Sequence, residues 1–232
     1  MNPQLILAKP DLDHARSNSM LEFVIRNQIG TNDALHKIVV PEVAPATAQK
    51  LIQRLIKRDL LKRWPLSGSK SYLRLGPSAI ARWQYPQSLS RRLGPQVLPY
   101  LLGSLSLMTY HKPPLKRLLP HQIIRQFPGF PATRDLHQWA YYRDRSSGVS
   151  RLVTVRVEFR VGGETVVQKI ADQLHRYRQH SAVDRLIDDQ RFLVHVVTAT
   201  PEQEAALWSA SERLLLPVEL RTCHDTSLTC FL

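Results

Sequence analysis

The clearest repeating pattern in the chain lies between residues 46 and 61. Apolar side chains recur there at helical spacing, which predicts an amphipathic helix that buries Ala48, Leu51, Ile52, Leu55, Ile56 and Leu60. The opposite side is polar and mostly basic, with Gln49, Lys50, Gln53, Arg54, Lys57 and Arg58. Two runs of alternating polarity follow at 60–66 and 71–75, joined by Ser67-Gly68-Ser69-Lys70. They predict a β-hairpin with a glycine in its turn.

Two shorter helices are predicted before this one. Ser19 is followed three residues later by Glu22, which predicts a capping box for a helix that ends at Gly30. Thr31 can cap a second helix that reaches Ile38. Residues 1–18 show no strong periodicity and are interpreted as a polar lead. Three helices followed by a basic hairpin is the order of a winged helix-turn-helix, and we predict such a domain over residues 19–84.

Proline density marks the middle of the chain. Residues 85–134 hold eight of the sixteen prolines, a density that regular elements tolerate poorly. We predict an ordered connector there, with helices at 96–109 and 119–127.

The pattern changes again from residue 135. Strands are predicted at 138–142, 152–159, 192–197 and 218–221, and helices at 165–179 and 201–215. The alternation predicts an α/β domain over residues 135–232, with a mixed sheet and helices on its faces. The whole chain is therefore predicted to be an α+β protein, with a winged helix-turn-helix joined to an α/β domain.

Charge is distributed unevenly along the 232 residues, whose formal net charge is +13. Residues 1–134 hold 20 Lys and Arg against 6 Asp and Glu, a net of +14, whereas residues 135–232 hold 12 against 13, a net of −1. Within residues 50–92, 11 basic residues stand against Asp59 alone, a net of +10. Such a cluster attracts polyanions. Because it coincides with the predicted helix and hairpin, we expect double-stranded DNA as the partner.

The predicted DNA contacts follow from that geometry. The helix would enter the major groove with side chains that reach phosphates and base edges, and the hairpin would lie along the backbone or the adjacent minor groove. The predicted DNA-binding residues are Gln49, Lys50, Gln53, Arg54, Lys57, Arg58, Lys62, Arg63, Lys70 and Arg74. A homodimer is also predicted, because paired half-sites add affinity.

Three stretches together resemble the replication-relaxation family of bacterial mobile-element proteins. They are residues 51–63, residues 72–79 and Val155-Arg156-Val157-Glu158-Phe159-Arg160. The resemblance covers most of residues 19–210. It implies an N-terminal winged helix, a C-terminal domain related to restriction endonucleases, and a role in replication control or transcriptional regulation of a mobile element.

The residues allow a direct test for nuclease chemistry. Mg²⁺-dependent cleavage needs carboxylates on adjacent strands and a nearby lysine, in the pattern Asp, then Glu-x-Lys. Glu158 supplies the glutamate, but Arg160 stands where the lysine is expected, and arginine serves poorly as a proton acceptor. An active nuclease would have to use Glu158 with Asp135 or Asp144, and Lys169. We therefore expect a degenerate, inactive domain without a cofactor, with Mg²⁺ needed only in the nuclease alternative.

The remaining chemistry is sparse. Cys223 and Cys230 cannot build a disulfide framework, which favours a reducing, cytoplasmic location. No signal peptide or membrane span is predicted. Cys223, His224 and Cys230 lack a nearby fourth metal ligand, and His195 lies in an apolar strand, where a hydrogen-bonded core histidine is expected. A second alternative is a protein-binding adaptor whose basic face meets an acidic partner.

Overall fold

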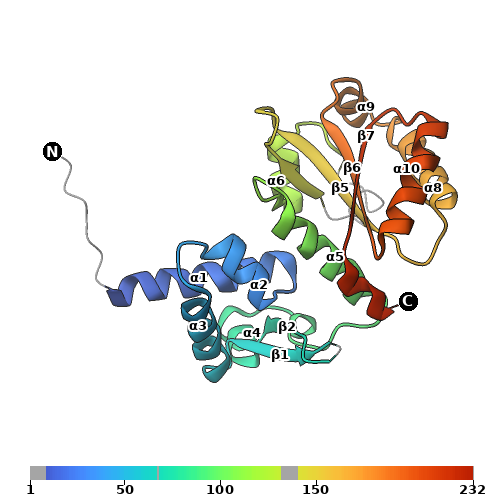
Figure 1. Ribbon diagram of the computed structural model, residues 1–232. Coiled ribbons are helices and arrows are strands. Elements are labelled where there is room, and N and C mark those ends of the chain that lie inside the picture. Colours follow the sequence, from blue (N-terminus) through green and yellow to red (C-terminus); the bar gives the residue numbers. More distant parts are fainter. Residues whose placement is uncertain (1–8, 67, 132–140, 232) are drawn as a thin grey trace. The chain divides into compact units, whose positions relative to one another are not determined.

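The computed structural model describes residues 9–66, 68–131 and 141–231 and shows a chain of mixed α and β structure (Figure 1). The chain divides into two compact units, Met1–Gly94 and Pro95–Leu232. The elements of the N-terminal unit are α1 (Lys9–Asn27), α2 (Asn32–Ala34), a π-helical turn (Leu35–Val39), α3 (Pro45–Lys57), β1 (Leu61–Pro65), β2 (Ser71–Leu75), α4 (Pro77–Trp83) and a 3₁₀ turn (Gln87–Leu89).

The predicted third helix and hairpin of the N-terminal unit are confirmed. Strands β1 and β2 pair antiparallel, from Leu61 opposite Leu75 to Pro65 opposite Ser71. Gly68 has a φ of 59° in the turn between them, a conformation that favours glycine. The cap at Thr31 is also confirmed, because its hydroxyl accepts a hydrogen bond from the Ala34 N–H.

The start of the first helix was predicted wrongly. Helix α1 begins at Lys9, so that Ser19 lies inside it and the predicted polar lead is partly helical. Residues 12–18 carry few apolar side chains, and the sequence therefore lacks the periodicity by which a helix is recognised. Ion pairs formed by Asp13 and Arg16 hold this part of the helix to later segments.

The core of the N-terminal unit joins the helices to the hairpin. Leu21, Leu51, Leu55 and Leu73 are among its buried residues. Gly30 exchanges two backbone hydrogen bonds with Leu73, at 3.0 and 2.8 Å. This antiparallel bridge places a third chain segment beside the two-stranded hairpin. This pairing connects the segment between α1 and α2 to β2.

The C-terminal unit contains a five-stranded sheet in the order β3-β4-β5-β6-β7. Strands β3 and β4 and strands β4 and β5 pair antiparallel, whereas β5 and β6 and β6 and β7 pair parallel. The predicted mixed sheet is thus confirmed. The strands are β3 (Lys116–Arg117), β4 (Tyr141–Asp144), β5 (Arg151–Val157), β6 (Phe192–Thr198) and β7 (Glu219–His224). The helices are α5 (Val97–Tyr110), α6 (Pro120–Gln126), α8 (Gly163–Tyr177), α9 (Ser181–Asp188), α10 (Pro201–Leu214) and a final 3₁₀ turn (Thr226–Phe231).

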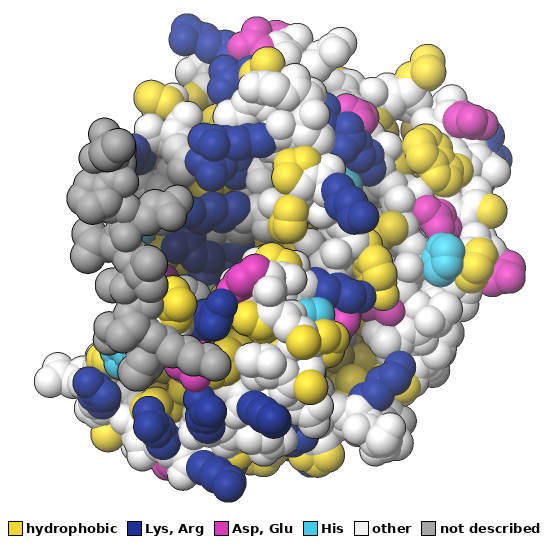
Figure 2. Space-filling view, turned by 60° about the vertical axis from the view of Figure 1, so that its left-hand side comes forward, with side chains coloured by type: hydrophobic (Ala, Val, Ile, Leu, Met, Phe, Trp, Pro, Cys, Tyr) yellow, Lys and Arg dark blue, Asp and Glu magenta, His cyan; other side chains and the backbone are white. Residues whose placement is uncertain are grey.

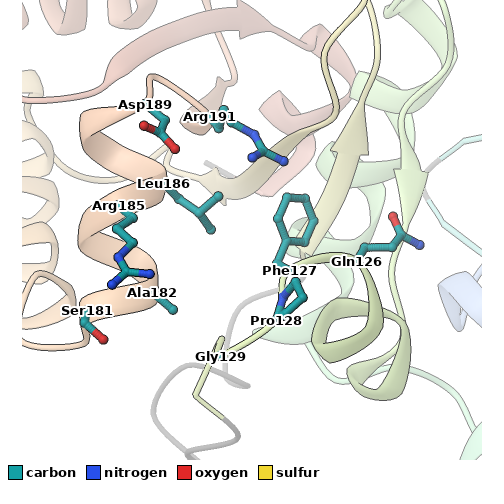
Figure 3. Close-up of a pocket in the computed structure, with 10 residues that line it drawn as sticks. All are labelled: Gln126, Phe127, Pro128, Gly129, Ser181, Ala182, Arg185, Leu186, Asp189 and Arg191. Carbon is teal, nitrogen blue, oxygen red and sulfur yellow. The ribbon is translucent and has the colours of Figure 1, made fainter.

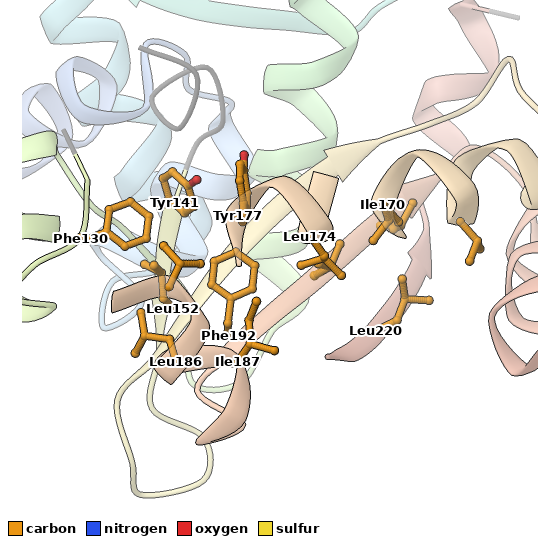
Figure 4. Packing of buried hydrophobic residues seen from close by; sticks show 14 of the residues in the cluster. Phe130, Tyr141, Leu152, Ile170, Leu174, Tyr177, Leu186, Ile187, Phe192 and Leu220 are labelled. Carbon is orange, nitrogen blue, oxygen red and sulfur yellow. The ribbon is translucent and has the colours of Figure 1, made fainter. Parts of the chain in front are cut away.

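One face of this sheet forms the larger apolar core. Phe192 and Leu152 pack there with Leu174 and Tyr177 of α8 and with Ile187 of α9 (Figure 4). The short helix α9 was not predicted, although four of its eight residues are apolar and three of these, Val183, Leu186 and Ile187, are buried. Most of the first predicted strand, 138–140, lies outside the described residues.

Helix α5 lies against the opposite face. Tyr100 Oη donates to the Val155 carbonyl over 3.4 Å, and a Cβ added to Gly103 would come within 2.9 Å of Val157. Val155 and Val157 point to the face opposite Leu152, because side chains alternate along a strand. The boundary between the units therefore lies at Gly94 and Pro95, and the described residues from 95 to 131 belong to the C-terminal unit rather than to a separate connector.

Candidate nucleic-acid interface

The polar side of α3 is open to solvent. Ala48, Leu51, Ile52 and Leu55 are buried, and the residues between them are therefore turned outward. Gln49, Lys50, Arg54 and Lys57 are exposed, Gln53 is half-buried, and Arg58 is exposed directly after the helix. The helix has Pro45 in its first turn and no acidic residue there.

Among the described residues, Arg54 is the one predicted contact on α3 that forms an ion pair with a distant segment. Its Nη1 lies 2.7 Å from Oδ2 of Asp13 on α1. Asp13 also lies 3.7 Å from Arg16, whose Nε donates to Glu42 over 2.9 Å. Asp13 was not predicted as a functional residue, because a pairing over 41 positions leaves no local signal in the sequence.

The hairpin carries three of the predicted basic residues on its surface. Lys62, Arg63 and Lys70 are exposed. The Lys62 ammonium lies 4.5 Å from the centre of the Trp64 ring, a cation–π contact that orients it along β1. Lys70 follows the turn at Gly68 and stands at the tip of the hairpin.

Arg74 was predicted to contact DNA and is instead buried, with 2% of its surface exposed. Its Nε and Nη2 donate to the carbonyl oxygens of Leu89 and Ser88 over 2.9 and 2.6 Å. Burial lowers the pKa of its guanidinium. Arg74 thus attaches the segment after α4 to the back of the hairpin and is withdrawn from any ligand.

The electrostatic character of this surface is strongly positive. Asp59, the single acidic residue of the 50–92 stretch, accepts hydrogen bonds from the Ser78 N–H and hydroxyl, both at 3.2 Å, at the start of α4. Figure 2 shows Lys and Arg side chains of the N-terminal unit gathered in a row along the lower edge of the view. Exposed cations in such a row raise a local potential that attracts a polyanion.

Asp144 and Glu158, two of the candidate nuclease residues, lie far apart among the described residues. Asp144, on β4, pairs in register with Arg151 at the start of β5, whereas Glu158 directly follows the end of β5. Seven residues of strand separate the two positions, roughly 20 Å at the usual rise per residue. Lys169 is exposed on α8, and Asp135 lies outside the described residues. Asp144 and Glu158 therefore cannot share one Mg²⁺ ion.

Both carboxylates are also occupied by arginines. Asp144 Oδ2 lies 2.8 Å from Arg151, and Glu158 Oε1 lies 3.0 Å from Arg156. Burial would raise the pKa of Asp144, but hydrogen bonds from Ser146 and Arg151 outweigh it, and the pKa is lowered. These arrangements are those of structural ion pairs. In the part of the chain that the structure describes, no three His, Cys, Asp or Glu side chains gather in a way that could hold a metal ion.

The two cysteines of the C-terminal unit differ in exposure: Cys223 is half-buried, whereas Cys230 is exposed, with its Sγ 3.0 Å from the Ser227 carbonyl oxygen. Burial raises the pKa of the Cys223 thiol to about 12, which leaves it protonated and a poor nucleophile. His224 Nδ1 lies 2.7 Å from Glu204. His195 is 4% exposed, which confirms its expected place in the core, although its Nε2 has no hydrogen-bond partner among the described residues.

A small hollow of about 280 Å³ lies between α9 and the loop after α6 (Figure 3). Arg191 extends over the Phe127 ring at 5.9 Å, and its Nε donates to the Ser150 carbonyl over 3.3 Å. Of the two arginines that line the hollow, Arg191 thus has a structural role. None of the predicted site residues lines it.

Comparisons of the chain with protein-family models, with curated proteins and with solved structures gave no match. No helix in the described ranges has both the length and the apolar character that crossing a bilayer requires. The interface must therefore be interpreted from its own residues.

Proposed function

We propose that this chain binds double-stranded DNA through its N-terminal unit. The observation that carries the proposal is the exposed basic face of α3 beside a hairpin whose own basic residues are exposed. Lys50, Arg54 and Lys57 would enter or flank the major groove, where guanidinium, ammonium and amide groups reach phosphates and base edges. Arg63 and Lys70 would contact the backbone beside the adjacent minor groove.

The arrangement of the elements supports a winged helix-turn-helix. Helices α1, α2 and α3 precede the hairpin, and the Gly30–Leu73 pairing ties the segment between α1 and α2 to it. With 13 residues, α3 is roughly 20 Å long, enough to lie in a major groove. The buried side of α3 faces the core, so its basic side remains for the ligand.

We further propose that the chain is a mobile-element protein of the replication-relaxation type, acting in replication control or transcriptional regulation at the nucleoid of the cytoplasm. The C-terminal unit would then be a degenerate, inactive relative of restriction endonucleases. Its mixed sheet with helices on both faces supports this, as does the separation of Asp144 from Glu158. A homodimer would add affinity through paired half-sites, and a monomer by light scattering, with and without DNA, would contradict that part.

The experiment is fluorescence anisotropy of a labelled random duplex titrated with the full chain. In one variant Lys50→Ala is combined with Lys57→Ala. In the matched control Lys169→Ala is combined with Arg176→Ala, two exposed cations on α8. Each variant loses two positive charges.

We expect the α3 variant to bind less tightly. The slope of log K against log salt should become shallower by the equivalent of about two phosphate contacts. The control should bind as the wild type does. Equal losses in both variants would mean that net charge, rather than this face, governs binding. No binding of any form at low salt would exclude DNA and favour an acidic protein partner.

A further inference from the structure

A groove of about 570 Å³ lies within the N-terminal unit, beside the proposed DNA-binding face. Its walls come from α1, the end of α3, α4 and Tyr85. Leu21 and Leu55, which are 3% and 2% exposed, belong both to this groove and to the core of the unit. The volume lies within the range of about 300–1,000 Å³ usual for pockets that hold small organic ligands.

One wall of the groove is aromatic. Trp83 is 36% exposed, and its ring meets that of Tyr85 edge to face, with the centroids 6.4 Å apart. An exposed indole beside an apolar floor leaves a large flat surface in water. A planar ring that stacked on it would remove that surface from solvent.

The groove is also positively charged. Arg58 and Arg82 line it, against Glu22 as the acidic side chain. The Arg82 guanidinium lies 5.9 Å from the centre of the Trp83 ring, so that cation and stacking surface adjoin each other. Neither arginine forms a salt bridge with any residue that the structure describes.

We infer that this groove binds a small ligand made of a flat aromatic ring and a negatively charged group. The ring stacks on Trp83, and the anion is held by Arg82 and Arg58. A nucleotide and an aromatic carboxylate share this chemistry. Hydroxyl and amide groups of Ser17 and Asn18 at the rim can donate to the polar edge of either one.

The groove is connected to the proposed DNA contacts through one residue. Arg58 directly follows α3 and belongs to both surfaces. If the proposed function holds, a ligand anion and a DNA phosphate compete for this guanidinium, and saturating ligand weakens DNA binding several-fold. The ligand site itself does not depend on DNA, and its binding is measured without it.

The test is isothermal titration calorimetry of the full chain with adenosine 5′-monophosphate and with 2-naphthoate. Adenosine and inorganic phosphate provide the ring and the charge separately. We expect one of the two aromatic anions to bind more tightly than both controls, and which one binds identifies the source. Binding of adenosine as tight as that of the nucleotide, or binding of neither aromatic anion at millimolar concentration, would overturn the inference.

Three variants locate the site. Trp83→Ala should weaken binding at least about fivefold, the lower limit for the loss of one aromatic stack, and Arg82→Gln should weaken it by about threefold, because the arginine is exposed. Trp208→Ala is the matched control, since this tryptophan of the C-terminal unit is 46% exposed. Equal losses in the Trp83 and Trp208 variants would contradict the assignment. DNA titrations of the same variants separate failure of the ligand site from failure of DNA binding.

Discussion

At the scale of single residues, the side chains of the β1–β2 hairpin differ sharply in burial. Arg63 is exposed, whereas Tyr72 and Arg74 are covered by residues 85–94. The Tyr72 hydroxyl accepts a hydrogen bond from the Leu93 N–H over 3.0 Å, and Arg74 donates to Ser88 and Leu89. The basic residues of one hairpin thus divide into exposed side chains and a buried one that holds neighbouring backbone.

Arg74→Ala is therefore expected to lower the free energy of unfolding of the N-terminal unit by about 2 kcal/mol, because two charge-assisted hydrogen bonds to carbonyl oxygens are lost. DNA affinity of the folded protein should stay unchanged. Arg63→Ala should do the reverse, with stability nearly constant and affinity reduced. Thermal unfolding and anisotropy on both variants check this. A loss of affinity in Arg74→Ala at a temperature where it is folded would contradict the burial.

His195 gives a pH-dependent contribution to the stability of the C-terminal unit. Burial lowers its pKa to about 3, with smaller effects from His111 and Arg221 in the same direction and from Asp144 in the opposite one. Between about pH 6.5 and pH 3 the unfolded histidine binds a proton that the folded one does not, so stability falls as the pH falls. The loss should reach about 2 kcal/mol at pH 5.

The check is denaturant unfolding at pH 7.5 and pH 5. His195→Leu should lose less stability on acidification than the wild type, whereas His121→Gln, at an exposed position of α6, should match the wild type. An unchanged pH dependence in His195→Leu would show that other groups cause it.

The sequence predicts the chemistry of these positions better than their surroundings. Alternation in 71–75 places Arg74 and Tyr72 on one face of the hairpin, but only the folded chain shows that residues 88–93 cover that face. The apolar neighbours of His195 predicted its burial, yet its missing partner depends on packing against distant segments.

At the scale of elements, α1 acts on the exposed face of α3 through Asp13. The carboxylate holds the Arg54 guanidinium at 2.7 Å, where a DNA phosphate would otherwise bind. The pair is largely exposed, so it stabilises the fold by at most about 1 kcal/mol.

Asp13→Asn should therefore strengthen DNA binding, by up to about fivefold, because it frees Arg54 and removes a negative charge. The matched control is Asp33→Asn, which removes one negative charge from an exposed pair with Lys37. Anisotropy titrations of both variants compare the two effects. Equal strengthening by Asp33→Asn would mean that net charge alone explains it.

Element prediction succeeded where periodicity is strong and failed where tertiary contacts determine the structure. The apolar stripe of α3 and the Gly68 turn marked their elements in the sequence itself. The first turns of α1 are polar and depend on ion pairs with α3 and Glu42. Helix α5 was predicted, but its place on the C-terminal sheet follows from contacts such as Gly103 with Val157, over more than 50 positions.

At the scale of the whole molecule, the dense basic stretch and the candidate nuclease residues lie in different units. The N-terminal unit carries the basic stretch, whereas several carboxylates of the C-terminal unit form ion pairs, such as Glu158 with Arg156. Asp144 and Glu158 stand at opposite ends of β5, a separation that depends on the β4–β5 register, which the local sequence pattern does not give.

Glu158→Ala should accordingly act on stability. It removes the ion pair of the buried Arg156, whose Nη1 also donates to Gln173 over 2.9 Å, and this loss should cost about 1–3 kcal/mol in the C-terminal unit. Supercoiled plasmid incubated with Mg²⁺ should remain intact with the wild type. Nicking by the wild type that disappears in a folded Glu158→Gln variant would contradict the assignment of a structural role.

The central claim is that the N-terminal unit neutralises DNA phosphates, and the salt dependence of affinity tests it most directly. Anisotropy titrations of the full chain on a random duplex at several salt concentrations give the slope of log K against log salt. Contacts from α3 and the hairpin to about six phosphates predict a slope near −5. A slope near zero, or no binding even at low salt, would contradict DNA binding by this face.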